Sequence, residues 1–316
     1  MLNRRLLQLL GLAVAAASAA SPQASCSDHA GAASASSALL QLSTQQQQEL
    51  LTVSQVQDTS KDQQGPGYEH PAWLQACKTI YLDVGSNIGV MVRKLYEPES
   101  YPEATALPLF SSRFGPPNLR GLPSNVSGIC ALGFEPNPHR TSHLAELASN
   151  YSSKGWHVHF YPFAAWSGEG TMQFNIQNKP ERADWGAKLV DKSAELSSTV
   201  EDLVSVRSID LAAFVKSLPA QSVGLMKMDI EGAEYETLAH MLEKDVLCSD
   251  FIPEMFMEAH GWGDISHWTG SRTFEAVAEA LSSASCSAET QRTKLNSLDD
   301  ETYLMDDGVI KVDDEK

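Results

Sequence analysis

Basic side chains are scarce in this chain: 23 lysines and arginines stand against 40 acidic residues, which gives a net charge of −17. A protein that grips nucleic acid needs a basic face to meet the phosphates. The charge therefore makes nucleic acid a poor candidate partner. It favours solubility and disfavours an anionic partner surface, but it does not identify a substrate.

Cysteine is scarce too. The chain has five cysteines, and no two have the close spacing of a zinc ribbon or a redox CxxC motif. An odd number leaves at least one thiol unpaired within the chain, and the spacing assigns no disulfide. Cys130 lies in a run typical of a buried strand, where we interpret it as a small hydrophobic residue.

Long apolar runs are absent except near the N-terminus, where two arginines precede an apolar stretch over residues 6–20 that ends in small residues. This pattern is typical of a secretory signal. It is short for a membrane span, which needs about 20 apolar residues, although an uncleaved anchor stays open. We therefore expect a signal peptide or signal anchor over residues 1–25 and a secretory location, in the endoplasmic reticulum or Golgi lumen or outside the cell.

A chloroplast or mitochondrial transit peptide is the alternative, because the first 48 residues carry a single acid, Asp28, and are rich in serine and alanine. Two glycosylation sequons, at Asn125 and Asn150, fit the secretory route. A signal anchor would be the one expected link to a membrane.

The regions flanking the predicted domain have biased compositions. Residues 26–70 hold few large apolar side chains to offset ordering entropy and predict a disordered low-complexity linker. Residues 291–316 form an acidic tail, which we interpret as a solvated end, although residues 303–310 could form an edge hairpin. The domain between them, residues 71–290, contains a Pro-rich insertion at 97–127, which is too long for an ordinary connection. It is either a lid over the site, which we slightly favour, or a surface insertion.

Within this domain short apolar runs alternate with helical stretches. The predicted strands are Thr79–Leu82, Ile129–Phe134, His157–Tyr161, Val223–Met228 and Phe251–Met257, and the predicted helices are His139–Tyr151, Asp210–Leu218, Glu231–Lys244 and Thr273–Ser283. Such alternation predicts an α/β fold with a mainly parallel central sheet and helices on both faces. The strand runs lack a clean polar alternation, which fits strands buried on both faces.

The first predicted strand runs into the string Asp83-Val84-Gly85-Ser86-Asn87-Ile88-Gly89. Gly85 lets the backbone approach a ligand closely, and Gly89 allows close packing where a helix begins. The spacing is G-x-x-x-G rather than the G-x-G-x-x-G of dinucleotide pyrophosphate sites. S-adenosylmethionine has no phosphate to be bound, so the string suits that ligand, with Asp83 holding the amino group of its methionine part.

Acidic residues stand at the ends of later strands. Glu135 follows the second strand, where a carboxylate can accept hydrogen bonds from both ribose hydroxyls; the alternative is an acid stabilised by a helix dipole. Asp229 stands at the tip of the fourth strand, where open α/β sheets bind ligands. Glu258 and His260 follow the fifth strand and point the same way in an extended chain. A histidine there could take a proton at neutral pH.

Four strings resemble the FkbM-type methyltransferase family in the same order: Tyr81–Gly89, Gly133–Pro138, Ser208–Asp210 before a helix, and Lys227–Glu234. The resemblance covers roughly residues 77–262, and its most distinctive part is the string from Asp229 to Glu234. It implies a class I methyltransferase Rossmann-like fold, S-adenosylmethionine as donor and, typically, a hydroxyl oxygen as acceptor. We expect the cofactor-binding residues to be Asp83, Gly85, Ser86, Asn87, Gly89 and Glu135. The Pro-rich insertion departs from the family pattern, and it bears on the acceptor pocket rather than on the donor site.

A hydroxyl is a poor nucleophile until its proton leaves, so a general base or a metal is expected. We expect Asp229, Glu258 or His260 to be the catalytic base. Asp229 and Glu258 could instead hold a divalent ion through oxygen ligands, although no metal-binding residues are assigned. The predicted function is an S-adenosylmethionine-dependent O-methyltransferase acting on a hydroxyl of a sugar, glycan or small metabolite. An NAD-dependent oxidoreductase, disfavoured by the missing middle glycine, and a non-catalytic nucleotide-binding scaffold are the alternatives.

Overall fold

The computed structural model describes residues 68–176, 188–189, 203–260, 273–283, 285–287 and 289–304. The chain divides into two compact units, Met1–Glu69 and His70–Lys316. The predictions for the signal segment, for the linker up to residue 67 and for residues 305–316 lie outside the described residues. The second unit carries the fold and the site.

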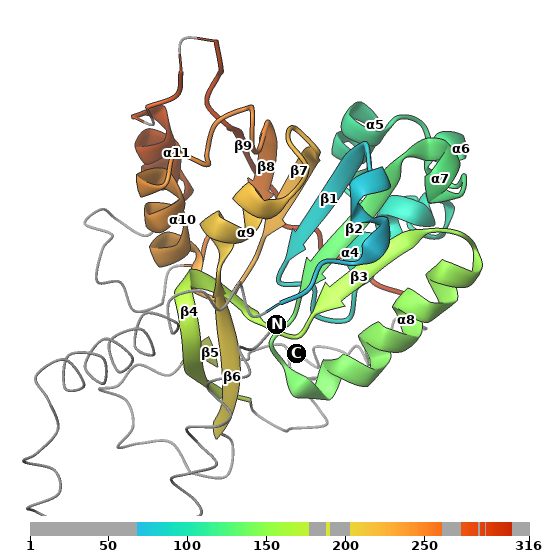
Figure 1. Ribbon diagram of the computed structural model, residues 1–316, viewed down its shortest axis with the longest axis horizontal. Coiled ribbons are helices and arrows are strands. Elements are labelled where there is room, and N and C mark those ends of the chain that lie inside the picture. Colours follow the sequence, from blue (N-terminus) through green and yellow to red (C-terminus); the bar gives the residue numbers. More distant parts are fainter. Residues whose placement is uncertain are drawn as a thin grey trace, which may run out of the picture. The chain divides into compact units, whose positions relative to one another are not determined.

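Six parallel strands form the central sheet (Figure 1). In spatial order they are β3 (His157–Tyr161), β2 (Ile129–Phe134), β1 (Thr79–Val84), β7 (Val223–Met228), β8 (Glu254–Met257) and β9 (Lys294–Ser297). Every pairing among them is parallel. β2 and β8 are buried at each position, as expected for strands covered on both faces. The five predicted strands are confirmed, and the fifth begins only after Pro253, which cannot donate to the sheet ladder.

Helices cover both faces of this sheet (Figure 1). One face carries α4 (Val90–Tyr96), α5 (Leu107–Phe114) and α8 (Thr141–Ser153), with the short 3₁₀ turn η4 (Pro138–Arg140) before α8; the other carries α9 (Leu211–Ser217), α10 (Glu234–Glu243) and α11 (Phe274–Ser282). α9 begins after Asp210, whose carboxylate caps it by accepting from the Ala213 N–H. α10 begins later than predicted because Glu231 and Gly232 have φ of 55° and 94°, which a helix cannot contain. None of the helices in the described ranges is both long and apolar enough to cross a bilayer.

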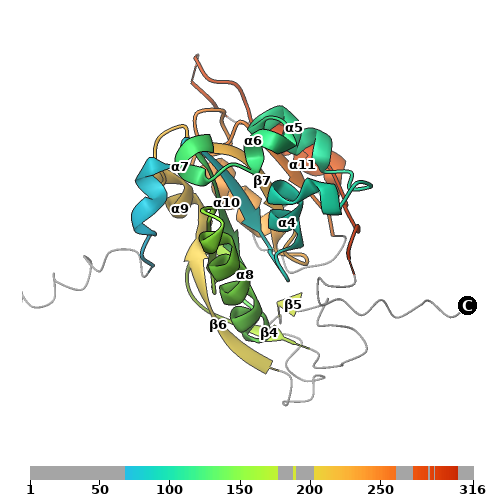
Figure 2. The ribbon, with the colours of Figure 1, turned by 90° about the vertical axis from the view of Figure 1, so that its right-hand side faces the viewer.

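The Pro-rich segment 97–127 forms the 3₁₀ turn η3 (Pro98–Ser100) and the helices α5, α6 (Pro117–Arg120) and α7 (Ser124–Ser127). Phe110 and Phe114 of α5 are buried and pack edge-on against Tyr81 of β1. Both views place α5, α6 and α7 at the end of the sheet away from β4 and β6 (Figures 1 and 2). The interpretation of this segment as a lid is wrong: its aromatic side chains cover a sheet face and complete the core.

A second, antiparallel sheet has the order β5-β4-β6, formed by β4 (Ala164–Asn175), β5 (Lys188–Leu189) and β6 (Leu203–Asp210). The sequence analysis did not predict it. Met172, Phe174 and Ile176 alternate with polar residues, which is the pattern of a strand buried on one side. β4 follows β3 after two residues and therefore starts beside the carboxyl ends of the main strands.

The acidic C-terminal segment is partly anchored. The fully buried Lys94 of α4 forms an ion pair with Asp300 at 2.9 Å, and Asp300 also accepts from the Ala106 N–H at 2.8 Å. Burial alone would raise the pKa of Asp300, but these partners hold it below its usual value. The prediction of a solvated end is therefore wrong for residues 298–304, where Tyr303 and Leu304 pack against the core. Among the described residues β9 is the edge strand of the sheet, and the predicted hairpin over residues 303–310 lies mostly outside them.

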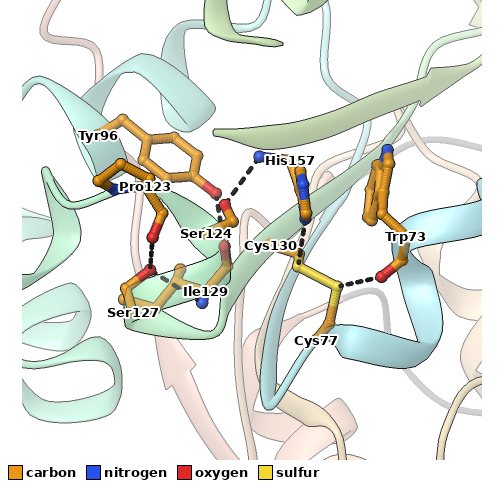
Figure 3. The surroundings of a disulfide bond; sticks show 9 residues. All are labelled: Trp73, Cys77, Tyr96, Pro123, Ser124, Ser127, Ile129, Cys130 and His157. Atoms are coloured by element: carbon orange, nitrogen blue, oxygen red, sulfur yellow. Dashed lines mark hydrogen bonds between the residues drawn. A yellow bond between two sulfur atoms is a disulfide. The ribbon is translucent and has the colours of Figure 1, made fainter. Parts of the chain in front are cut away.

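Two disulfides tie loops to the core. Cys77, after the 3₁₀ turn η2 (Ala72–Ala76), is bonded to Cys130 of β2, and Cys248 is bonded to Cys286. Beside the first bond, Trp73 stacks on His157 with ring centroids 4.9 Å apart (Figure 3). The interpretation of Cys130 as a small hydrophobic residue is wrong, because the fold brings together two cysteines that are 53 residues apart in the sequence.

Candidate functional site

Two adjoining pockets lie at the carboxyl ends of the strands. The first, which we call the apolar pocket, is formed among residues 85–87, 134–137, 164–174 and 229–233. The second, which we call the acidic pocket, is formed among residues 86–91, 227–231, 256–258 and 298–303. They hold about 710 and 660 Å³ of empty space, part of it open to solvent. Asn87, Asp229 and Glu231 line both, so the pockets meet at these three residues.

The glycine loop after β1 fits tightly between neighbouring strand ends. Gly85 has φ of 87°, and a Cβ there would stand 1.7 Å from the carbonyl oxygen of Asp229. Only glycine fits this approach of β1 to β7. Asn87 adopts φ of 48°, a left-handed conformation that asparagine tolerates. Gly89 faces α8, where a Cβ would stand 2.6 Å from Leu147. Gly85 and Asn87 line the apolar pocket, whereas Gly89, also predicted to bind the cofactor, lines neither pocket and instead lets the loop pack closely on α8.

Glu135, at the end of β2, holds this loop in place. Its Oε2 accepts from the Asn87 N–H at 2.7 Å, and its Oε1 accepts from the Asn137 N–H at 2.8 Å. Burial raises the pKa of Glu135 to about 7, against the two hydrogen bonds that lower it. Each carboxylate oxygen keeps acceptor capacity, so the group can still accept from two vicinal hydroxyls. The cap of the following η4 turn is Asn137, not Glu135, because the Asn137 side chain accepts from the His139 N–H.

The far wall of the apolar pocket comes from β4. Ala164, Ala165, Trp166, Met172 and Phe174 line it. Together with Phe134 of β2 they form an apolar wall of the kind that accommodates a planar base. These residues were not predicted as site residues, because β4 was not predicted from the sequence. The alternation of apolar and polar residues over 171–176 could have predicted this strand, whereas no pattern in the sequence singled out Trp166.

Asp83 lies beneath the pockets rather than in them. Its side chain is fully buried, accepts from the Tyr81 hydroxyl at 3.3 Å, and has one oxygen, Oδ2, without a hydrogen-bond partner among the described residues. Lys227 Nζ stands 4.0 Å from Asp83 and 3.0 Å from Asp229, and it donates to the Gly85 carbonyl at 2.6 Å. Burial raises the pKa of Asp83 to about 6, and Lys227 opposes that rise. The prediction that Asp83 holds a ligand's amino group is therefore not supported here.

Lys227 is a site residue that the sequence analysis did not single out, although it begins the quoted string Lys227–Glu234. Burial alone would lower its pKa, but Asp229 and Asp83 hold it well above the usual value. Lys227 therefore stays a cation. It joins the ends of β1 and β7 through one carbonyl and two carboxylates.

His260 is 5% exposed and lies among carboxylates. Its Nδ1 is 2.9 Å from Glu234, and its Nε2 is 3.3 Å from Glu258. Asp229 and Glu231 stand 4.0 and 3.9 Å from the same Nε2. Burial alone would lower the pKa of His260, but these carboxylates raise it to about 10. The resulting imidazolium has no lone pair to receive a proton, so this geometry does not favour the predicted base role of His260.

The acids of the turn after β7 have two different surroundings. Glu234 is fully buried and accepts from the N–H groups of Ile230 and Gly232 at 2.8 and 2.9 Å. Asp229 and Glu231 instead line both pockets. Burial raises the pKa of Glu231 to about 7, and His260 opposes that rise. Glu231 was not among the predicted catalytic residues, although it too lies in the quoted string.

The remaining predicted residues lie in the acidic pocket. Ser86 and Glu258 line it, and the Ser86 hydroxyl donates to the Asp83 carbonyl at 3.0 Å. At the two pockets, two groups of side chains are compact enough to hold a cation, with ligand atoms within 4.8 Å of one another: Asp229 with Glu231 and His260, and Glu258 with Asp299 and Glu301. Asp229 and Glu258, the two ligands predicted for a shared divalent ion, therefore belong to different groups.

The fold and the site together define a class of protein. A parallel sheet of the order found here, a glycine loop after β1, an acid after β2 and acids after β7 make this a Rossmann-like fold of the class I methyltransferase type. The methyltransferase FkbM domain matches residues 83–285, well over half of the chain. The chain belongs to the FkbM methyltransferase family and is a methyltransferase, as the sequence resemblance indicated. No curated protein and no solved structure matches it.

Proposed function

We propose that this protein is an S-adenosylmethionine-dependent O-methyltransferase whose donor site is the apolar pocket. The observation that carries the proposal is Glu135, at the end of β2 inside that pocket, with acceptor capacity left on both oxygens. A ribose bound there would place its base against β4. Its other end would lie at Asn87, Asp229 and Glu231, where the two pockets meet.

The charge at that junction favours a cationic donor. Bound S-adenosylmethionine would supply an electrophilic methyl group on a sulfonium. Asp229 and Glu231 offer negative charge to the sulfonium, and their carboxylates can take the proton that an acceptor hydroxyl loses. Glu258 reaches the same acidic pocket and is a further base candidate. His260, as an imidazolium, holds these carboxylates together instead.

NAD fits this pocket less well. A dinucleotide site turns glycine-loop amides and a helix N-terminus toward a pyrophosphate. Here the Asn87 amide is already bound by the Glu135 carboxylate at 2.7 Å, and Asp229 and Glu231 line the same pocket. These charges would repel a pyrophosphate. The oxidoreductase alternative is therefore disfavoured, and the scaffold alternative is left to experiment.

The acceptor we propose is a hydroxyl of a sugar, a glycan or a small metabolite, encountered in the secretory pathway. Two disulfides support an oxidising compartment. Asn125 and Asn150 of the two sequons are both exposed, on α7 and α8, so a glycosyltransferase could reach them. A mobility shift of the expressed full chain on glycosidase digestion would support this placement, and an unmodified chain in a plastid or mitochondrial fraction would contradict it.

A methyl-transfer assay tests the proposed function. The full chain is incubated with methyl-labelled S-adenosylmethionine and a panel of glycosides and hydroxylated metabolites, and the product is analysed for alkali-stable methyl ethers. Asp229→Asn should lower turnover by about 100-fold or more, the usual contribution of a general base. Glu146→Gln changes an exposed acid on α8 and serves as the matched control. Donor binding without transfer to any acceptor would favour the scaffold alternative, and binding of NAD alone would favour the oxidoreductase.

A further inference from the structure

Methyl transfer is a direct displacement, so donor and acceptor must meet where their binding sites meet. In the part of the chain that the structure describes, the apolar pocket shares lining residues with the acidic pocket, and these are Asn87, Asp229 and Glu231. Provided that the apolar pocket is the donor site, as proposed above, the acidic pocket is where an acceptor hydroxyl can reach the methyl group.

The outer wall of the acidic pocket is the C-terminal segment 298–303, which the sequence analysis interpreted as a solvated tail. It is held at two points. The Leu298 N–H donates to the Met257 carbonyl at 3.3 Å, and Asp300 is held by Lys94 and by the Ala106 N–H. Asp299 and Glu301, on either side of this anchor, line the pocket. The segment therefore belongs to the site.

Negative charge dominates this pocket. Six carboxylates line it: Asp229, Glu231, Glu258, Asp299, Asp300 and Glu301. Lys227 pairs with Asp229 at 3.0 Å, Lys94 pairs with Asp300 at 2.9 Å, and His260 stands 3.3 Å from Glu258. Among the described residues no basic side chain forms an ion pair with Asp299 or Glu301.

A further carboxylate lies directly behind this pocket. Asp83 is fully buried behind Ser86 and Lys227, both of which line the pocket, and its Oδ2 has no hydrogen-bond partner in the described part of the chain. Lys227 stands 4.0 Å from Asp83 and 3.0 Å from Asp229, so it supplies one positive charge for two carboxylates.

We infer that the acidic pocket is the acceptor site and that its substrate is a hydroxyl compound carrying a positively charged amino group, such as an amino sugar or an amino alcohol. The ammonium group lies toward Asp299 and Glu301, and the reacting hydroxyl lies toward Asp229 and Glu231. The oxygen forms a bond to the methyl carbon as the carbon–sulfur bond breaks, and its proton passes to a junction carboxylate. The products are a methyl ether and S-adenosylhomocysteine.

The test compares three probes with one skeleton: a methyl glucoside, the corresponding amino sugar as its ammonium form, and the corresponding uronic acid. Calorimetry on the full chain saturated with S-adenosylhomocysteine measures their affinities, and labelled S-adenosylmethionine measures transfer. We expect the amino sugar to bind at least tenfold more tightly than the uronic acid, with the glucoside between them. The difference should shrink as salt is raised, and the amino sugar should be methylated.

The double variant Asp299→Asn with Glu301→Gln removes two exposed charges and should cut the preference for the amino sugar at least threefold. Glu146→Gln, an equally exposed acid outside both pockets, should leave it unchanged. Equal binding of the three probes, preference for the uronic acid, no binding of any probe, or binding of the amino sugar without its methylation would each overturn the inference. Failure of the proposed function is distinct, because S-adenosylhomocysteine itself would then not bind.

Discussion

Replacing Glu135 by glutamine should weaken the binding of S-adenosylmethionine by roughly 10- to 100-fold. The carboxylate keeps one acceptor position on each oxygen for a ribose hydroxyl. Hydrogen bonds to a charged group contribute about 1.5–3 kcal/mol, and each 1.4 kcal/mol corresponds to about tenfold in affinity. Glutamine retains one neutral acceptor oxygen, so one charge-assisted bond is lost and the other is weakened.

The same substitution should remove a pH dependence. Only ionised Glu135 accepts from both hydroxyls, and burial raises its pKa to about 7. At about pH 6 only about a tenth of the protein carries the ionised form, so affinity should rise roughly tenfold between about pH 6 and about pH 8 and then level off. In Glu135→Gln this rise should be absent.

Isothermal titration calorimetry over this pH range measures both effects, with Glu146→Gln as the control for loss of one acidic charge. Glutamine also turns an amide nitrogen toward the Asn87 or Asn137 N–H, so thermal unfolding must be recorded to show that the variant is folded at the titration temperature. A folded Glu135→Gln protein with unchanged affinity and an unchanged pH profile would refute the assignment of Glu135 to the ribose.

The free energy of unfolding should fall as pH rises from about 4 to about 6, because buried Asp83 has its pKa raised from 3.8 to about 6 and the folded state therefore holds a proton that the unfolded chain has lost. Glu135 and Glu231, with pKa values raised to about 7, add to the same fall, so urea titrations of Asp83→Asn should show a shallower slope rather than none. An identical slope would contradict the assignment. His260, with its pKa raised from 6.5 to about 10, contributes stability that is fully present below pH 6.5 and is lost as pH rises to about 10. Urea titrations of His260→Gln should show a smaller loss of unfolding free energy between pH 6.5 and about pH 10. An unchanged loss would show that the ion pairs do not form. Opening the Cys77–Cys130 bond by Cys77→Ser should lower the free energy of unfolding by about 4 kcal/mol, the value expected for a loop of 53 residues. A loss below about 1 kcal/mol would show that the bond does not constrain the chain in solution.

The parts of the site that the sequence predicts are those fixed by local geometry. A strand that ends in a glycine turn, or in an acid, places that residue at the carboxyl edge of a parallel sheet. This is why Gly85, Glu135 and Asp229 could be assigned to the pocket and were found there. Strands β1, β2 and β7 were predicted because buried, mainly apolar runs of six residues have few alternatives.

The parts that the sequence did not predict depend on contacts between distant segments. Whether Asp83 faces a ligand or lies beneath the loop depends on where Lys227 places its ammonium group, 144 positions later in the chain. The charge state of His260 depends on carboxylates from the turn after β7. No local pattern encodes either arrangement.

Composition misled the interpretation of two segments. The prolines of residues 97–127 suggested an irregular lid, yet Phe110 and Phe114 bury that segment against the sheet. The acids of the C-terminal segment suggested a solvated tail, yet Asp300 has a buried lysine as its partner. In both segments one or two side chains that find a partner in the core outweigh the average character of the stretch.

A crystal structure of the full chain with S-adenosylhomocysteine tests the central claim most directly. The account predicts the ribose hydroxyls on the Glu135 carboxylate, the adenine against Trp166 and Phe174 of β4, and the sulfur beside Asp229 and Glu231 where the two pockets meet. Adenine in the acidic pocket, or a ribose that does not contact Glu135, would contradict it.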